Sequence, residues 1–424
     1  MNVSKAQLQS KFQNYFQRLN QSLTKPETRF IRDISVGILK NQNVTLNQIR
    51  IHLLDGIRLK STLERFRRQL NKLDLLPWLI PAHLEAVKSR LHSDDYALLD
   101  ISDIQKRYAR FQKGLAPVRD GSSGSIGNGY WFLNIFGVNR GGNLFVPLLS
   151  HIYSFTMGTN SENQEILNGI RQVITTIHKA LIWVIDRGGD RDQIIRFLIK
   201  MEQFFIIRLT SKRNLENKGK SMSVRLISRE FPLLLRYEAR RIRKNKLIVE
   251  TYDVGVMPVK YIDPYTHLVQ PQPFYLVVMK GIGKGFSWFL VKSPFSDPAE
   301  IAQDTFRGYG YRWHIEEYHR HIKDQFKLEN LQLRKFDRLQ IMLMIMAIAM
   351  YLLYTETRSL HPQLLLENKI KTITKANVWE LVGFVYYKIG TIFRILLSTV
   401  TVRSFIPLKK FLTTNTNQLS LNLV

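Results

Sequence analysis

Residues 161–210, SENQEILNGIRQVITTIHKALIWVIDRGGDRDQIIRFLIKMEQFFIIRLT, alternate between the two hydrophobic periods that distinguish helices from strands. Apolar residues recur at helical spacing in 161–179 and 190–202, whereas 180–186 and 203–210 contain short apolar runs. This order predicts helix, strand, helix, strand. Further strand-like runs come before it, at 95–100, 129–138 and 144–155. The central part of the chain is therefore predicted to form a mixed α/β layer.

The segments on either side of this layer have other patterns. Residues 1–85 carry apolar side chains at helical spacing, and Ser61 and Thr62 are the predicted start of an arginine-rich helix. This suits a helical DNA-binding domain, and a plain helical bundle with a basic surface is the alternative. Residues 212–292 consist mostly of strand-like runs, which include SVRLIS at 223–228, and predict a β-rich insertion. Helices are expected to resume near Asp297.

One apolar stretch needs to be tested as a membrane segment. Residues 341–354, IMLMIMAIAMYLLY, are continuously apolar and are flanked by charged residues on both sides. The stretch is shorter than the ~20 residues that a helix needs to span a bilayer. We predict a buried core helix and no membrane partner.

The composition indicates a polyanionic partner. The 424 residues include 62 Lys and Arg against 34 Asp and Glu, which gives a net charge of +28. A chain that is 45% hydrophobic is globular rather than disordered, so nucleic acid is the leading candidate partner. There is no cysteine, and the amino terminus has no apolar signal region. Both features fit a cytoplasmic protein.

A second informative stretch is YGYRWHIEEYHRHIKDQFK at 309–327. If it forms one continuous helix, a single polar face carries one acid among several bases. The members of this face are Tyr309, Arg312, Glu316, Arg320 and Lys323. A solvated face with pairs such as Glu316 to Arg320 is the alternative explanation, and Glu317 competes with Glu316 if the helix turns differently.

Two more acids follow apolar strands directly. Asp100 ends the run YALLD, and Asp186 ends ALIWVID, while Asp103 and Asp190 are their close rivals. Carboxylates at the ends of neighbouring strands can converge, and with Glu316 they would form a trio of oxygen ligands suited to Mg²⁺. Two such ions can stabilise the attacking and the leaving oxygen of a phosphodiester.

These motifs resemble those of a known family, the cut-and-paste DDE transposases of bacterial insertion sequences with a Tyr-x2-Arg-x3-Glu-x6-Lys signature. Tyr309, Arg312, Glu316 and Lys323 fill that signature without a gap. LLDISDIQKRYA resembles the first-acid motif and VIDRGGD the second, so the resemblance makes Asp100, Asp186 and Glu316 the catalytic metal ligands. It extends over about residues 95–350.

The resemblance implies an α/β fold with a ribonuclease H-like mixed-sheet core in two parts, residues 86–211 and 293–350. The β-rich insertion at 212–292 would lie between them, after the DNA-binding domain at 1–85. A helical C-terminal region at 351–424 would have a role in dimerisation.

DNA-binding residues are also implied. Arg208, Arg312, Arg320 and Lys323 would contact DNA phosphates, Tyr309 would hold backbone near the reacting end, and Trp288 would stack on a flipped base. The segment RYEARRIRKNK at 236–246 has six bases and one acid. It adds the expected DNA-binding residues Arg240, Arg241 and Arg243.

By this resemblance the protein is expected to bind the terminal inverted repeats of its element as a synaptic homodimer. With two Mg²⁺ ions, for which Mn²⁺ can substitute, it would nick DNA, form a hairpin, reopen it and join the end to target DNA. The implied location is the cytoplasm, in association with the nucleoid. A metal-dependent nuclease without strand transfer and a non-catalytic DNA-binding protein are the alternatives.

Overall fold

A computed structural model describes most of the chain. The residues described are 5–72, 75–119, 121, 124–159, 161–229, 231–243, 246–266, 269–281, 285–367 and 385–405, without the side chains of 240–247 and 366–367.

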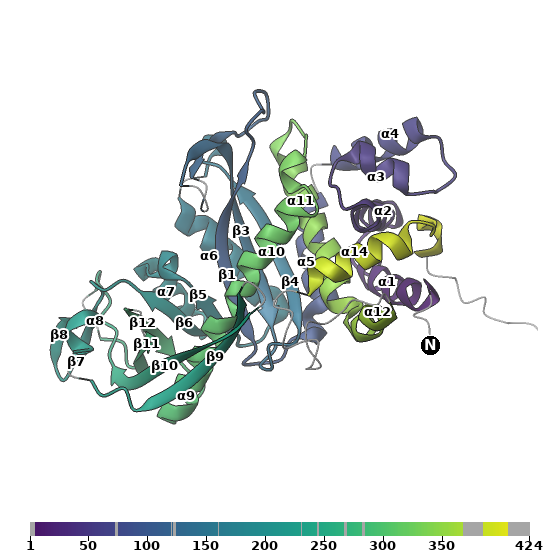
Figure 1. Ribbon diagram of the computed structural model, residues 1–424. Helices are drawn as coiled ribbons and strands as arrows, with labels where there is room; N and C mark the ends of the chain where they lie inside the picture. The colour runs from purple at the N-terminus through teal and green to yellow at the C-terminus, as the bar shows by residue number, and fades with distance from the viewer. Residues whose placement is uncertain are drawn as a thin grey trace, which may run out of the picture.

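Ten of the described strands form one large sheet (Figure 1). Its central path runs in the order β2 (Ala116–Arg119), β3 (Ile126–Val138), β1 (Tyr96–Gln105), β5 (Ile182–Ile185), β6 (Phe204–Leu209), β12 (Phe286–Lys292), β11 (Phe274–Gly281), β10 (Lys246–Val259) and β9 (Leu235–Arg243). Strand β4 (Phe145–Tyr153) pairs with β3. The short strands β7 (Asn214–Asn217) and β8 (Lys220–Ser223) form a separate hairpin. The predicted mixed α/β layer is therefore confirmed.

The middle of the sheet is parallel and both flanks are antiparallel. Strands β1, β5 and β6 run parallel, and β5 is buried along its whole length because helices cover both faces of the sheet. The helix α6 (Glu162–Ile177) precedes β5, and α7 (Asp192–Lys200) connects β5 to β6, as the alternating pattern of 161–210 predicts. Strands β9 to β12 of the 212–292 segment continue the same sheet beyond β6.

Different helices cover the two faces. A Cβ atom at Gly169 of α6 would lie 2.9 Å from the Leu133 side chain, so α6 packs closely on β3. On the opposite face lie α9 (Pro298–Tyr311) and α10 (Trp313–Asp324). A Cβ atom at Gly308 of α9 would lie 2.7 Å from Tyr96 and 3.0 Å from Ile206. Glycine therefore lets α9 lie directly on the parallel strands, and α9 begins at the Asp297 cap that the sequence predicts.

The remaining helices pack beside the sheet, where Figure 1 shows them around α11. They are α1 (Lys5–Leu19), α2 (Lys25–Asn41), α3 (Leu46–His52), α4 (Leu59–Leu70), α5 (Leu75–Val87), α11 (Phe336–Tyr351), α12 (His361–Glu367) and α14 (Tyr386–Leu397). The helix α8 (Val224–Ile227) lies apart from them, next to the β7–β8 hairpin. With the following π-helical turn, α11 is long and apolar enough to cross a membrane, but 83% of that window is buried inside the protein. The prediction of a buried core helix is confirmed.

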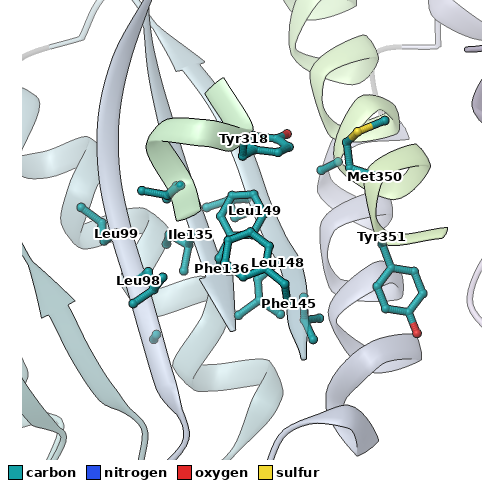
Figure 2. Packing of buried hydrophobic residues seen from close by; sticks show 14 of the residues in the cluster. Leu98, Leu99, Ile135, Phe136, Phe145, Leu148, Leu149, Tyr318, Met350 and Tyr351 are labelled. Carbon is teal, nitrogen blue, oxygen red and sulfur yellow. The ribbon is translucent and has the colours of Figure 1, made fainter. Parts of the chain in front are cut away.

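Aromatic side chains fill the space where the sheet meets these helices. The Phe136 ring lies 4.7 Å from Phe145 and 4.5 Å from Tyr318 of α10, measured between ring centroids. Figure 2 shows this cluster beside α11, which contributes Met350 and Tyr351. The core therefore joins α10, the helix of the candidate site, to strands β3 and β4.

Two local predictions were wrong. Residues 223–228 were expected to form a strand, but Val224–Ile227 form the short helix α8. The helix expected to start at Ser61 and Thr62 begins at Leu59 instead, and Thr62 is buried with its hydroxyl near Asp55. In this helix Arg65 pairs with Asp33 at 2.8 Å, so one of its arginines stabilises the bundle instead of extending its basic surface.

Histidine 83 links the N-terminal helices to the sheet and makes stability depend on pH. Its Nε2–H donates to the Pro147 carbonyl, so its Nδ1 accepts from the Tyr15 hydroxyl at 2.7 Å. Burial lowers the pKa of His83 from 6.5 to about 4, although the bond to Pro147 opposes this shift. The unfolded chain therefore takes up a proton first, and stability is lost as the pH falls from about 6.5 towards 4.

We expect His83→Gln to lower the free energy of unfolding at pH 7.5 by about 1–3 kcal/mol, because Tyr15 and Pro147 lose buried partners. Its stability should also fall less than that of the wild type between pH 7 and pH 5. Thermal unfolding at both pH values checks this. Equal pH dependence in the two proteins would show that His83 is not a source of the acid sensitivity.

Candidate active site

Strand register brings Asp100 and Asp186 together. Leu99 of β1 pairs with Ile185 of β5, and each acid follows its paired residue by one position. Parallel strands lie about 4.8 Å apart, so the two carboxylates leave neighbouring strands at the same level of the sheet. Asp100 also pairs with Asn134, whose side chain contacts α10, so Asp100 lies on the face that α9 and α10 cover.

Glu316 reaches this face from α10, but the predicted single helix over 309–327 was wrong. The chain leaves α9 after Tyr311 and enters α10 at Trp313, with Arg312 at the junction. This bend places Tyr309 on one helix and Glu316 on the next, so Tyr309 faces the end of β5 and Glu316 faces the middle of β1, where Asp100 lies before the strand ends at Gln105. Glu316 is 51% exposed, as a residue at a substrate-binding surface would be.

Arg312 lies among the three acids. Its guanidinium forms an ion pair with Glu316 and lies 4.0 Å from Asp100 Oδ1. Electrostatic attraction to Arg312 also lowers the pKa of Asp186, although burial of that carboxyl acts in the opposite direction. One largely enclosed cation thus lies close to three carboxylates.

Tyr309 and Arg208 complete the site on the β6 side. The Tyr309 hydroxyl donates to Asp186 Oδ1 at 3.0 Å and accepts from Arg208 Nη1 at 2.9 Å. The guanidinium groups of Arg208 and Arg312 both lie near the Tyr309 ring, at 5.7 Å and 5.5 Å from its centroid. Two positive groups next to an acid provide donors for a phosphate close to the carboxylates.

The donor set suits a hard divalent cation. Burial and then the negative charges of Glu316 and Asp186 raise the pKa of Asp100 to about 7, while Arg312 lowers it. Additional positive charge would therefore stabilise the ionised carboxylates, and carboxylate oxygens are the ligands that Mg²⁺ prefers. Among the residues that the structure describes, no three His, Asp or Glu side chains already stand close enough to hold a metal ion. Arg312 attracts all three acids electrostatically.

Sequence reasoning missed a chain of polar groups behind Asp100. The Ser150 hydroxyl donates to Asn134 Oδ1 at 2.7 Å, and Asn134 Nδ2 donates to His319 Nε2 at 2.9 Å. His319 therefore carries its proton on Nδ1, which lies 3.8 Å from Asp100 Oδ2. Burial lowers the pKa of His319 to about 3, so the ring is neutral. Its i,i+3 spacing from Glu316 on a helix was the available signal.

The alternative candidate acids, Asp103, Asp190 and Glu317, each contact another basic or polar side chain. Asp103 contacts Lys323 Nζ at 3.3 Å and Gln105 Nε2 at 3.0 Å. Asp190 has a 2% exposed side chain and forms an ion pair with Arg213 at 2.6 Å. Glu317 pairs with Arg320.

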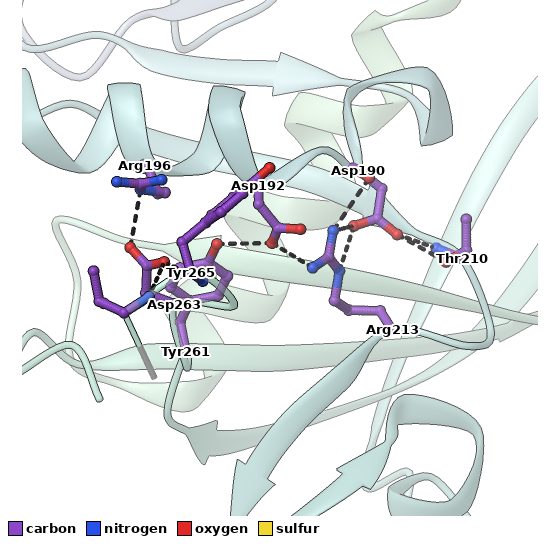
Figure 3. Close-up of polar contacts among 9 residues, drawn as sticks. Asp190, Asp192, Arg196, Thr210, Arg213, Tyr261, Asp263 and Tyr265 are labelled. Carbon is purple, nitrogen blue, oxygen red and sulfur yellow. Dashed lines mark hydrogen bonds and ion pairs between the residues drawn. The ribbon is translucent and has the colours of Figure 1, made fainter. Parts of the chain in front are cut away.

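A polar network surrounds Asp190 and joins the loop after Asp186 to the following segment (Figure 3). Arg213 forms ion pairs with both Asp190 and Asp192, and the Tyr261 hydroxyl donates to Asp192 Oδ1 at 2.8 Å. The backbone N–H of Thr210, just after β6, donates to Asp190 at 2.8 Å. The network thus fixes the loop that follows Asp186 to β6 and to the chain beyond it.

The predicted DNA-binding residues other than Trp288 lie in different places. Tyr309, Arg312 and Arg208 lie among the acids, and Lys323 points to the end of β1 through Ser102 at 3.3 Å. Arg320 is largely exposed on α10. The side chains of Arg240, Arg241 and Arg243 fall outside those that the structure describes.

Trp288 does not join the carboxylates. Arg208 pairs with Phe289, so alternation along β12 turns Trp288 to the other face of the sheet. There its Nε1–H donates to Ser228 at 3.0 Å. It lines an open cavity of about 660 Å³ together with Arg225, Arg229 and Lys280.

Part of this site lies in a stretch that is similar to a known protein family. Residues 149–352 match the family model described as the transposase DDE domain. The matched stretch contains Asp186 and Glu316, whereas Asp100 precedes it. No curated protein matches the chain. This part of the chain, slightly less than half of it, is therefore similar to the DDE domains of transposases.

Proposed function

We propose that the protein is a cut-and-paste DNA transposase of an insertion sequence, with Asp100, Asp186 and Glu316 as its catalytic acids. The observation that carries this proposal is the meeting of the three acids at Arg312, two from adjacent parallel strands and one from the helix above them. The match of residues 149–352 to the transposase DDE domain supports it independently of that geometry.

The proposed core is ribonuclease H-like, because the mixed sheet has helices on both faces and carries two acids on its central strands. The proposed signature residues Tyr309, Arg312, Glu316 and Lys323 all lie on the same side of this sheet or at the end of β1. Residues 1–85 and the 212–292 segment are the proposed DNA-binding regions, and 351–424 the dimerisation region. We also propose that the protein acts in the cytoplasm as a homodimer that holds two terminal inverted repeats together.

In this function the acids hold divalent cations and the bases hold DNA. Mg²⁺ or Mn²⁺ bound to Asp100, Asp186 and Glu316 would stabilise charge on the attacking and leaving oxygens of the phosphodiester. Arg208, Arg312 and the Tyr309 hydroxyl provide donors for the phosphate next to the scissile bond. Strand nicking, hairpin formation, hairpin opening and joining to target DNA are all phosphoryl transfers, so one such site serves each step.

The test compares the wild type with Glu316→Gln on a labelled duplex that carries the end of its element, in the presence of Mg²⁺. We expect nicks and hairpins at the element boundary from the wild type and none from Glu316→Gln, since the amide lacks the charge of the carboxylate. Glu317→Gln is the matched control because it makes the same change one residue away, and it should retain cleavage.

Each other outcome favours a different function. Cleavage without joining to a second duplex would indicate a nuclease. Binding without products from the wild type would indicate a non-catalytic DNA-binding protein. Equal products from the wild type and Glu316→Gln would remove Glu316 from the mechanism.

A further inference from the structure

The connection between β1 and β2 exposes two aromatic rings. Tyr108 is 96% exposed and Phe111 is 82% exposed, although both lie in a short loop beside well-packed strands. Aromatic rings bury a large apolar area when they find a partner, so two free rings three residues apart indicate a surface that is covered in a complex.

This loop is held firmly at both ends. Lys106 Nζ donates to the carbonyls of Glu329 and Leu331 at 2.7 Å and 2.9 Å. At the other end, Gln112 Nε2 donates to the Leu331 carbonyl at 3.2 Å, and the backbone N–H of Lys113 donates to Arg334 at 2.8 Å. The fixed ends display the two rings without the large loss of conformational entropy that a free loop would suffer on binding.

The space beside the rings is positively charged. A cavity of about 470 Å³ lies between the loop and residues 329–334. Its charged lining comprises Lys106, Arg107, Arg110 and Arg334 against one acid, Glu329. The Glu329 carboxylate already accepts the backbone N–H of Gln105 at 3.2 Å. Aromatic rings among arginines match a chain of bases joined by phosphates.

The strand that carries Asp100 also leads to this loop. β1 continues from Asp100 to Gln105, which is about 17 Å at ~3.3 Å per residue. A DNA strand spans that distance in at most about five nucleotides, because ~3.4 Å is the spacing within a duplex and an unstacked strand is longer. A strand whose phosphate lies at Asp100 can therefore reach the start of the loop that carries Tyr108 and Phe111 within about five nucleotides.

We propose that the loop at residues 106–115 is a binding site for single-stranded DNA, in which unpaired bases stack on Tyr108 and Phe111 while Arg107 and Arg110 contact their phosphates. Unpaired bases fit because their faces are free, whereas bases within a duplex already stack on one another. The site would hold the unpaired part of a DNA strand. The phosphodiester of the same strand would lie at the carboxylates Asp100, Asp186 and Glu316. The expected position of these bases rests on the proposed function, but the binding itself does not.

The test measures fluorescence anisotropy of labelled DNA without divalent ions, so that no cleavage occurs. The probes are one blunt duplex and the same duplex with thymidine tails either clearly shorter or clearly longer than about five nucleotides. We expect the wild type to bind the long-tailed duplex at least about tenfold more tightly than the blunt one, and the short tail to add little. Tyr108→Ala with Phe111→Ala should abolish this gain, since each ring contributes about fivefold or more.

Three controls separate stacking from other effects. Tyr108→Phe with Phe111→Tyr keeps both rings and should keep the gain. Ile126→Ala, which truncates a 76% exposed apolar side chain at the start of β3, should leave all affinities unchanged. Arg107→Gln with Arg110→Gln should reduce by about 2 the slope of log affinity against log salt for the long-tailed duplex.

Equal affinity of the wild type for the blunt and long-tailed duplexes would overturn the inference. So would an equal loss of both affinities in the protein that combines Tyr108→Ala with Phe111→Ala. If cleavage depends on Glu316 but the long tail does not raise affinity, this inference is wrong and the proposed catalytic function stands. If the long tail raises affinity but the wild type cleaves no DNA, the proposed catalytic function is wrong and the binding site for single-stranded DNA stands.

Discussion

Asp100→Asn is expected to reduce metal-dependent DNA cleavage by at least about 10³-fold, while the folded protein remains as stable as the wild type or becomes more stable. Activity falls because the amide cannot supply the negative charge that the proposed cation requires. Stability is preserved because burial and the neighbouring acids Glu316 and Asp186 already disfavour the charge on Asp100, as its raised pKa shows. Denaturing gels of labelled element ends and urea unfolding measure the two effects.

Asp103→Asn is the matched control on the same strand. Its carboxylate is buried and accepts from Lys323 and Gln105, so the change should lower stability and leave cleavage within about tenfold of the wild type. If Asp103→Asn abolished cleavage and Asp100→Asn did not, the first catalytic acid would be Asp103. A strongly destabilised Asp100→Asn protein would show that Asp100 has a structural role.

Much of this site could be predicted because its strands carry clear local signals. Apolar runs that end in Asp100 and Asp186 locate β1 and β5, although β1 continues past Asp100 to Gln105, so the expected strand end at Asp100 was wrong. The parallel pairing of the two strands had no local signal, because β2, β3, β4 and α6 lie between them in the chain. The burial of residues 341–354 could be predicted for a similar reason, since length and flanking charges distinguish a core helix from a membrane span.

Other features depend on contacts that no local pattern reveals. Helical periodicity continues through Arg312, yet the chain bends there, because two helices must lie on different strands of a twisted sheet. The face of the sheet on which Trp288 lies follows from its register with Leu209, which is set by tertiary pairing. The run at 223–228 has a strand-like composition, but Val224 and Ile227 are buried on one side of a single helical turn.

The sequence also gave no signal for the ion pair between Asp190 and Arg213. An acid four residues after Asp186 could as well be a metal ligand, and only the fold brings Arg213 to it. Asp192 shares that guanidinium and also accepts from Tyr261 of the 212–292 segment. The loop that positions the second catalytic acid is thus fixed by residues that are distant from it in sequence.

Arg213→Met is therefore expected to lower the free energy of unfolding by about 3–5 kcal/mol, because it leaves the buried Asp190 carboxylate without its counter-ion. The network in Figure 3 shows why the effect is large, since Arg213 contacts Asp190 through its Nε and Nη2 atoms and Asp192 through Nη1. Methionine keeps much of the side-chain volume, so the loss reports charge rather than packing. Urea unfolding at neutral pH measures it.

Arg236→Met is the matched control, because Arg236 pairs with Asp253 at 2.8 Å but is 70% exposed. Removal of this solvated pair should cost about 0–1 kcal/mol. Arg213→Met should also lower cleavage activity under conditions where it stays folded, since the loop carrying Asp186 loses its anchor to β6. A combined Arg213→Met and Asp190→Asn protein should regain part of the lost stability, because its buried amide carries no charge. Equal destabilisation by Arg213→Met and Arg236→Met would mean that water solvates Asp190 in solution and that Arg213 does not hold the loop.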